Sequence, residues 1–157
     1  MRPSPAVKFI ATWLTVALWA SAARATDFDT PVGSRCMSRE DAALLKQAGH
    51  LGKFKCDGTS FRFLGRIESA ADNYLVYDFR FLFKAAAADH GGQRLIIFDR
   101  NGRYLGQYAF YSRPLADIAV EGSSVRLTVP GETRAIDFSP GPPPSIYFDG
   151  DTQKFYK

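Results

Sequence analysis

The sequence is poor in tryptophan, cysteine and histidine, with two of each in 157 residues. Both tryptophans, Trp13 and Trp19, lie in the first 25 residues, so the rest of the chain has no indole ring for a flat binding platform. The two histidines, His50 and His90, provide few imidazoles for acid–base catalysis. Two cysteines without a C-x-x-C spacing argue against a metal site and against a redox pair. The sequence therefore predicts no bound metal and no cofactor.

The first 25 residues have the composition of a signal peptide. Arg2 and Lys8 give a basic start, the segment 9–20 is apolar, and a small-x-small pattern for signal peptidase ends at Ala25. An apolar run of about 12 residues is too short to span a bilayer comfortably, so we expect cleavage after Ala25 and no stable membrane anchor. A cut after Ala22 is the alternative. The sequence thus predicts a periplasmic or secreted protein.

The basic net charge belongs mostly to this predicted leader. Of the 20 Lys and Arg residues, three lie in the first 25 positions, which contain no acidic residue. Without the leader, 157 residues less 25 leave 132, and 17 basic against 16 acidic side chains lower the formal net charge from +4 to +1. Nucleic-acid binding needs a clear surplus of positive charge to neutralise phosphates. A near-neutral mature chain therefore argues against a nucleic-acid partner.

The two cysteines, Cys36 and Cys56, both remain after the predicted cleavage. In an oxidising compartment such an even pair predicts a disulfide. Its loop would enclose the one convincing helix, which Ser38 caps with Asp41 three residues later and which Gly49 ends. We therefore expect a helix of about ten residues tied to the domain by the Cys36–Cys56 bridge.

From residue 61 onward, apolar and polar residues alternate with the period of a β-strand. Tight turns connect about nine short strands, and no second helix is long enough to serve as a parallel crossover. The sequence therefore predicts a mainly β fold, an antiparallel meander that closes into a small barrel or forms a two-layer sandwich. The predicted strands are 61–67, 75–83, 95–98, 104–110, 118–120, 125–129, 134–138, 146–149 and 153–156.

A mature chain of this length fits one domain, and no internal repeat divides it. We expect a cleaved signal peptide over 1–25, an exposed N-terminal segment over 26–37 and a single β-rich domain over 38–157. Two acidic sequences, Asp99-Arg100-Asn101-Gly102 and Asp149-Gly150-Asp151, lie where one predicted strand ends and the next begins. The first has glycine too early for a calcium loop, and the second places both carboxylates in one turn instead of across a substrate. Both therefore predict hairpin turns.

The longest predicted connection, between the strands 75–83 and 95–98, contains Asp89 and His90. Long connections often carry function, so these two residues are candidates for partner or ligand contact. No Gly-x-Ser-x-Gly elbow supplies a nucleophile for them. Four further side chains are expected to contribute to a contact surface: Tyr74, Arg80, Tyr111 and Arg113.

These features favour an exported, non-enzymatic β-domain that binds another macromolecule. The aromatic side chains of the strands are expected to fill a solid core. An alternative is a carrier that holds a small apolar ligand inside a β-barrel. A third possibility is a hydrolase that uses Asp89 and His90, although the sequence predicts no catalytic residue by motif.

Overall fold

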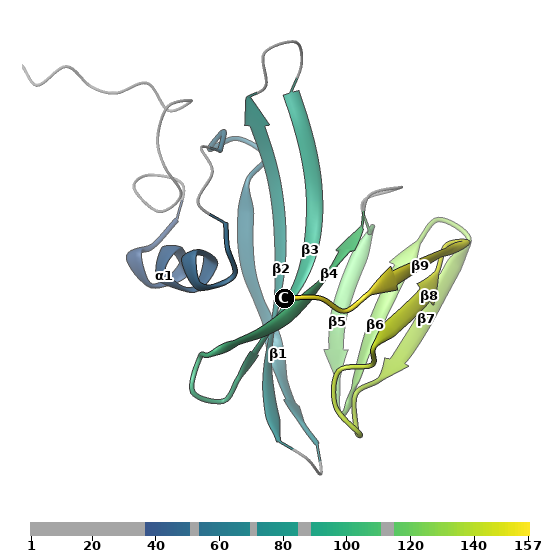
Figure 1. Cartoon of the computed structure of the whole chain (residues 1–157). Coiled ribbons are helices and arrows are strands. Elements are labelled where there is room, and N and C mark those ends of the chain that lie inside the picture. Colours follow the sequence, from purple (N-terminus) through teal and green to yellow (C-terminus); the bar gives the residue numbers. More distant parts are fainter. Residues whose placement is uncertain (1–36, 51–53, 70–71, 85–88, 111–114) are drawn as a thin grey trace, which may run out of the picture.

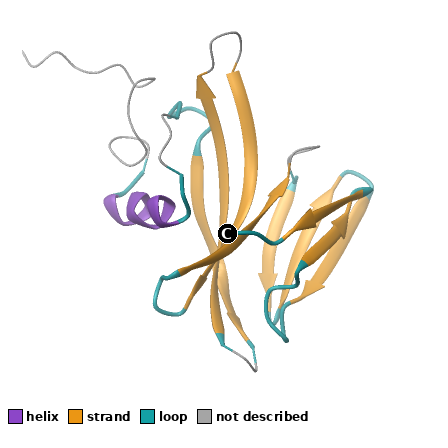
Figure 2. Ribbon diagram, in the orientation of Figure 1, coloured by secondary structure: helices purple, strands orange, loops and turns teal. Residues whose placement is uncertain are grey.

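The computed structural model describes residues 37–50, 54–69, 72–84, 89–110 and 115–157, with the backbone alone for 83, 84, 89 and 90 (Figure 1). Nine β-strands and one short helix make up this part of the chain, as the alternating sequence pattern predicts (Figure 2). The elements are α1 (Arg39–Gln47), β1 (Ser60–Glu68), β2 (Asn73–Lys84), β3 (Asp89–Asp99), β4 (Tyr104–Phe110), β5 (Asp117–Glu121), β6 (Ser124–Val129), β7 (Glu132–Asp137), β8 (Ser145–Phe148) and β9 (Asp151–Lys154).

The strands pair in sequence order, and every pairing between them is antiparallel. They form a four-stranded sheet β1-β2-β3-β4, a three-stranded sheet β5-β6-β7 and the hairpin β8-β9. The antiparallel meander is therefore confirmed, whereas a closed barrel is wrong, because the strands of the described chain form three open sheets. The prolines at 140 and 142–144, which have no N–H to donate to a ladder, separate β7 from β8.

The long strand β2 is apolar on both faces, and this sets the layering of the fold. Its residues Tyr74 and Val76 enter the main core, which the four-stranded sheet shares with β5, β6 and β8. The alternate residues, including Tyr77 and Phe79, lie in a second core under helix α1. Each face of β2 is thus covered by a different layer, and the helix and the small sheets lie on opposite sides of it (Figure 1).

Helix α1 begins and ends where the sequence predicts. The Ser38 hydroxyl accepts a hydrogen bond from the Asp41 amide at 3.0 Å. At the other end Gly49 has a φ of 81°, and the His50 amide donates to the Leu45 carbonyl at 2.9 Å, which is a Schellman motif. The fully buried Leu45 then packs on the sheet, where it joins the second core.

The C-terminal tail connects the β8-β9 hairpin to strand β4 of the four-stranded sheet. Gln107 and Tyr156 exchange two backbone hydrogen bonds, of 2.8 and 3.1 Å. The next side chain inward, Phe155, covers Gly106, where an added Cβ would lie 2.5 Å from the ring. The Tyr108 hydroxyl donates to the Pro143 carbonyl at 2.6 Å. This bond ties the proline segment 142–144 to strand β4 of the four-stranded sheet.

The predicted pairing of Cys36 with Cys56 concerns one residue inside the described chain and one outside it, because Cys36 precedes residue 37. The described residues include no free cysteine. The Cys36–Cys56 disulfide stays a prediction. The helix among these residues is not long and apolar enough to cross a membrane.

Candidate functional site

A buried carboxylate organises the polar residues on the core side of the four-stranded sheet. The Asp78 side chain is 2 % exposed and accepts hydrogen bonds from Gln93 Nε2 at 2.7 Å and from Arg80 Nε at 2.9 Å. Arg62 lies beyond, with Nη2 3.6 Å from the same carboxylate. Gln93 in turn accepts from the Leu115 amide at 2.7 Å. Two guanidinium groups thus share one carboxylate, and the cluster has a net positive charge.

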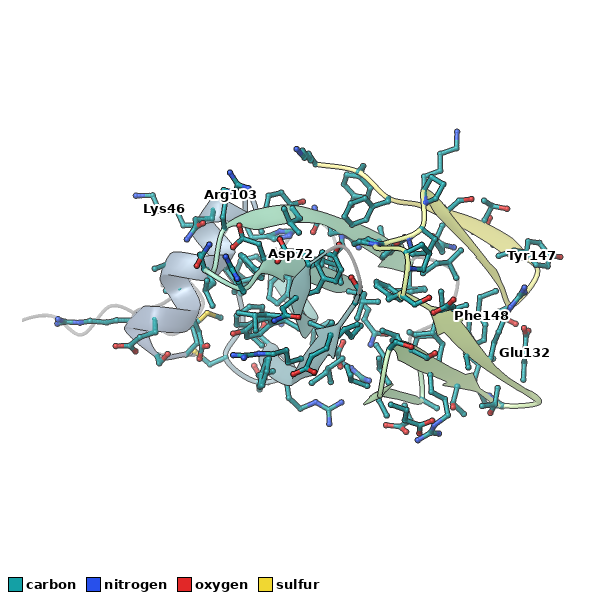
Figure 3. The ribbon with its side chains drawn as sticks, turned by 90° about the horizontal axis from the view of Figure 1, so that it is seen from below. Lys46, Asp72, Arg103, Glu132, Tyr147 and Phe148 are labelled. Carbon is teal, nitrogen blue, oxygen red and sulfur yellow. The ribbon has the colours of Figure 1, made fainter. Side chains whose placement is uncertain are left out.

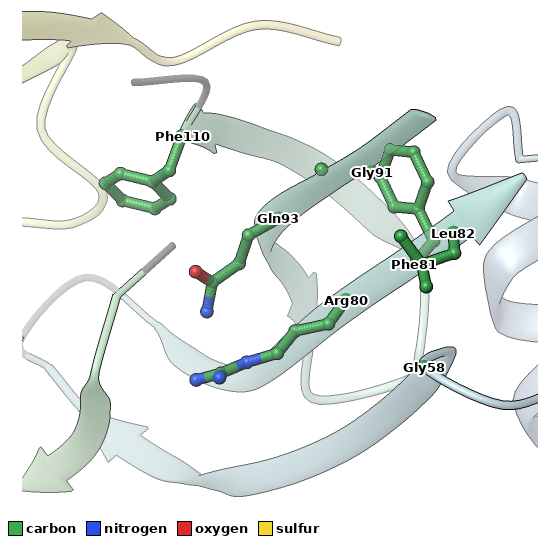
Figure 4. A pocket seen from close by; sticks show the side chains of 8 residues that line it. Gly58, Arg80, Phe81, Leu82, Gly91, Gln93 and Phe110 are labelled. Atoms are coloured by element: carbon green, nitrogen blue, oxygen red, sulfur yellow. The ribbon is translucent and has the colours of Figure 1, made fainter. Parts of the chain in front are cut away.

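A pocket of about 350 Å³ opens beside this cluster, at the end of the sheet where β2 and β4 finish. Arg80 and Gln93 project to the same side of the sheet as Phe110, as Figure 4 shows. Backbone and apolar side chains form the rest of the wall. The lining residues are Gly58, Arg80, Phe81, Leu82, Gly91, Gly92, Gln93 and Phe110.

A partly exposed group of rings lies on the opposite face of the sheet, at its edge strand β1. The Phe61 and Tyr77 rings stack at 4.6 Å with an interplanar angle of 8°, and Phe63 lies 5.2 Å from Tyr77. The Phe63 side chain is 52 % exposed, although it lies on the same face of the sheet as the second core. We call Phe61, Phe63 and Tyr77 the aromatic patch. Burial raises the pKa of Tyr77, with a smaller contribution from the Asp41 carboxylate, so its hydroxyl stays a neutral donor at pH 7.

The structure does not bring the four residues of the predicted contact surface together on one exposed face. Tyr74 is buried in the main core, which corrects the prediction that it faces outward. It faces inward because Tyr74 and Val76 alternate with the helix-facing residues of a strand that is covered on both sides. Arg80 is 35 % exposed and lines the pocket. Tyr111 and Arg113 lie outside the described residues.

Asp89 and His90 lie in strand β3 and not in the predicted long connection. The ladder between β2 and β3 continues through Leu82↔Gly91, Phe83↔His90 and Lys84↔Asp89. The sequence Gly91-Gly92 suggests a loop, but these glycines make room for the side chains of the neighbouring strand. A Cβ on Gly92 would lie 2.7 Å from the Phe81 ring. The loop prediction was therefore wrong, because packing determines the backbone here.

The sequence did not indicate that His50 would be half-buried against the sheet. Its Nε2 lies 2.9 Å from Gln107 Oε1, and its ring lies 4.9 Å from that of Phe79. Burial lowers the pKa of His50 below its ordinary value; the Gln107 hydrogen bond opposes this shift, and Arg94 adds to it. Its position directly after the helix-ending glycine was the available signal, since the Schellman motif turns the next residue back toward the core.

We expect His50 to make the domain less stable in mild acid. The unfolded chain binds the imidazole proton more readily than the folded chain, so stability is full above the unfolded pKa and falls as the pH drops through it. In urea unfolding at about pH 8 and about pH 5, His50→Gln should lose less stability between the two than wild type. His90 is present in both proteins, so its contribution to the pH dependence cancels in the comparison. Equal losses would contradict the burial of a neutral His50.

The two acidic sequences form hairpin turns, as predicted. Asp99 accepts hydrogen bonds from the backbone N–H groups of Asn101 and Arg103, both at 2.9 Å. These bonds lower the pKa of Asp99, and the bond from the Arg103 amide contributes most. Asp149 has a φ of 51° and Gly150 a φ of 76°, as a tight β8–β9 turn requires.

No protein-family model, no curated protein and no solved structure matches this chain. Within the described ranges, no three His, Cys, Asp or Glu residues are grouped so that they could hold a metal ion. The pocket and the aromatic patch are therefore the features from which a function can be inferred.

Proposed function

We propose that this protein is an exported, non-enzymatic β-domain that binds another protein through the aromatic patch. The observation that carries the proposal is the Phe63 ring, which is 52 % exposed at the edge of an aromatic face that is otherwise packed. Large rings that are held in place by neighbouring rings lose little side-chain entropy on binding. Phe63 fits this description, because Tyr77 supports it at 5.2 Å.

The surroundings of the patch favour a protein partner. Arg66 is exposed on the same face of β1, across the bulge between Phe63 and Gly65. Aromatic and arginine side chains are the residues that most often dominate protein–protein interfaces. The near-neutral charge of the predicted mature chain gives no comparable support to nucleic acid.

The other exposed aromatic side chains are placed differently. Tyr147 is 57 % exposed on β8 and lies at the end of the molecule away from the helix (Figure 3). Its backbone carbonyl accepts from Arg134 Nη1 at 2.6 Å, but its ring contacts no other aromatic ring in the described chain. Tyr147 is therefore a matched control for Phe63, with similar exposure and no supporting ring.

The alternatives have less support in this geometry. A carrier that encloses an apolar ligand inside a barrel needs a closed barrel, and the described strands form open sheets. A hydrolase based on Asp89 and His90 needs them in a cleft beside a nucleophile. The backbone places both residues in a regular strand pairing with β2, and their side chains lie outside the described part.

Export predicts a defined mature protein. When the full chain is expressed with its own leader, the mature form should begin at Thr26 and should be found outside the cytoplasm. If Cys36 and Cys56 form the predicted disulfide, an alkylating agent should increase the intact mass only after reductant has been added. Mass spectrometry of the fractionated protein checks both points. A full-length chain in the cytoplasm with two free thiols would contradict the export proposal.

Binding through the patch predicts a position-specific cross-link. A photoreactive phenylalanine analogue at position 63 should give one discrete protein adduct in the compartment where the chain resides. The same analogue at position 147 should give none, although the natural side chains at the two positions are similarly exposed. Excess wild-type protein should compete for the adduct, and Phe63→Ala should compete at least about tenfold more weakly. Adducts of equal yield at both positions, or none at position 63, would contradict the proposal.

A further inference from the structure

The pocket at the end of the four-stranded sheet has one charged side chain in its wall. Asp78 binds Arg80 through Nε at 2.9 Å. Within the described chain, the terminal nitrogens Nη1 and Nη2 of Arg80 have no hydrogen-bond partner. A guanidinium group has five N–H donors, so the four on Nη1 and Nη2 remain available, and the edge formed by these two terminal nitrogens faces away from the Nε–Asp78 bond. Asp78 therefore holds Arg80 in one orientation and leaves its outer edge free.

The local charge favours an anion at this edge. Arg62 and Arg80 share the single Asp78 carboxylate, and Gln93 donates to the same group. Among the described residues that line the pocket, no other side chain is charged. A cation would meet an excess of positive charge, whereas a carboxylate can accept two parallel N–H bonds from the free edge of Arg80.

The remaining walls are apolar. Phe81, Leu82 and Phe110 line the pocket, and glycines take the places where side chains would stand. An added Cβ would lie 2.9 Å from Leu82 at Gly91 and 2.5 Å from Leu82 at Gly58. Because these two glycines have no side chain, Leu82 packs directly against the backbone at Gly58 and at Gly91. This part of the pocket wall is therefore apolar.

We propose that this pocket binds a small amphipathic carboxylate, such as a medium-chain fatty acid. The carboxylate binds the free edge of Arg80, and the hydrocarbon tail lies along Leu82 and Phe110. A volume of about 350 Å³ is at the lower end of the range for small-molecule sites. No residue of the aromatic patch lines the pocket, and Arg80 and Phe110 lie on the opposite face of the sheet from the patch, so this site is separate from the proposed protein-binding surface.

Titration calorimetry with decanoate and with decanol on the mature protein tests the site. Decanoate should bind wild type, and decanol, which has the same tail without the charge, should bind at least about tenfold more weakly. Arg80→Gln should reduce decanoate affinity about tenfold or more. Arg126→Gln should not change it, because Arg126 is equally exposed, at 35 %, but lies on β6 in an ion pair with Glu121.

Nuclear magnetic resonance on wild type gives a second readout that does not depend on how Arg80→Gln folds. Decanoate should shift the Leu82 methyl groups and the Gly91 and Gly92 amides, and decanol should shift them much less. Equal binding of decanoate and decanol, no binding of decanoate, undiminished binding by a folded Arg80→Gln, or shifts confined to other residues would each overturn the proposal.

Discussion

Phe79→Ala should destabilise the domain by about 3–5 kcal/mol, the largest effect we expect from a single substitution. Phe79 is fully buried between helix α1 and the sheet. Its ring lies within 4.9 to 5.5 Å of three other rings: His50, Phe54 and Phe81. Removing it leaves a cavity that these rings cannot close, because each is also held by its own strand or segment. Urea unfolding followed by circular dichroism measures the loss.

Phe63→Ala is the matched control for this prediction. It removes the same ring from the same face of the same sheet, but Phe63 is 52 % exposed. Its loss should be below about 1 kcal/mol, which is the range of one surface ring contact. Similar losses for the two variants would show that the helix does not cover Phe79 as described.

Asp78→Ala should destabilise the domain by about 3 kcal/mol. The substitution leaves the buried Gln93 amide without its acceptor, and it leaves Arg62 and Arg80 close together without the carboxylate between them. The loss is below that of a wholly buried ion pair because Arg80 is 35 % exposed and solvent screens part of its charge.

Glu68→Ala is the control for Asp78→Ala. Glu68 is an acidic residue on β1, the strand that carries Arg62, but it is exposed. Its removal should change stability by no more than about 0.5 kcal/mol. Asp78→Asn separates charge from packing: it keeps the shape but presents an amide to two guanidinium groups, so it should also be destabilising. A loss below about 1 kcal/mol for Asp78→Ala would contradict the organising role of this carboxylate.

Local signals in the sequence predicted the parts of the fold that local chemistry decides. The cap at Ser38, the stop at Gly49 and the turn at Asp99 each depend on residues a few positions apart, and the structure has all three. The start of β3 does not depend on local chemistry. Gly91 and Gly92 have weak strand preference, and they extend the strand because Leu82 and Phe81 pack over them.

The candidate sites could be predicted only in part, because exposure depends on which layers cover a strand. Alternation in β2 separates Tyr74 from Tyr77, but it does not show that both faces are covered. The same pattern assigns Phe63 to a buried face, since the sequence does not show that β1 is an edge strand that the helix leaves partly open. The alternating pattern of β2 places Asp78 and Arg80 on a polar face that would be expected to face solvent. Only the structure shows that the Asp78 carboxylate is buried.

Native mass spectrometry of the mature protein, recovered gently from its own compartment, tests the central claim most directly. Wild type and Tyr147→Ala should each carry a second polypeptide of the same mass, and Phe63→Ala should be recovered without it while melting like wild type within a few degrees. The same second polypeptide on Phe63→Ala, or a bare chain in all three samples, would contradict binding through the aromatic patch.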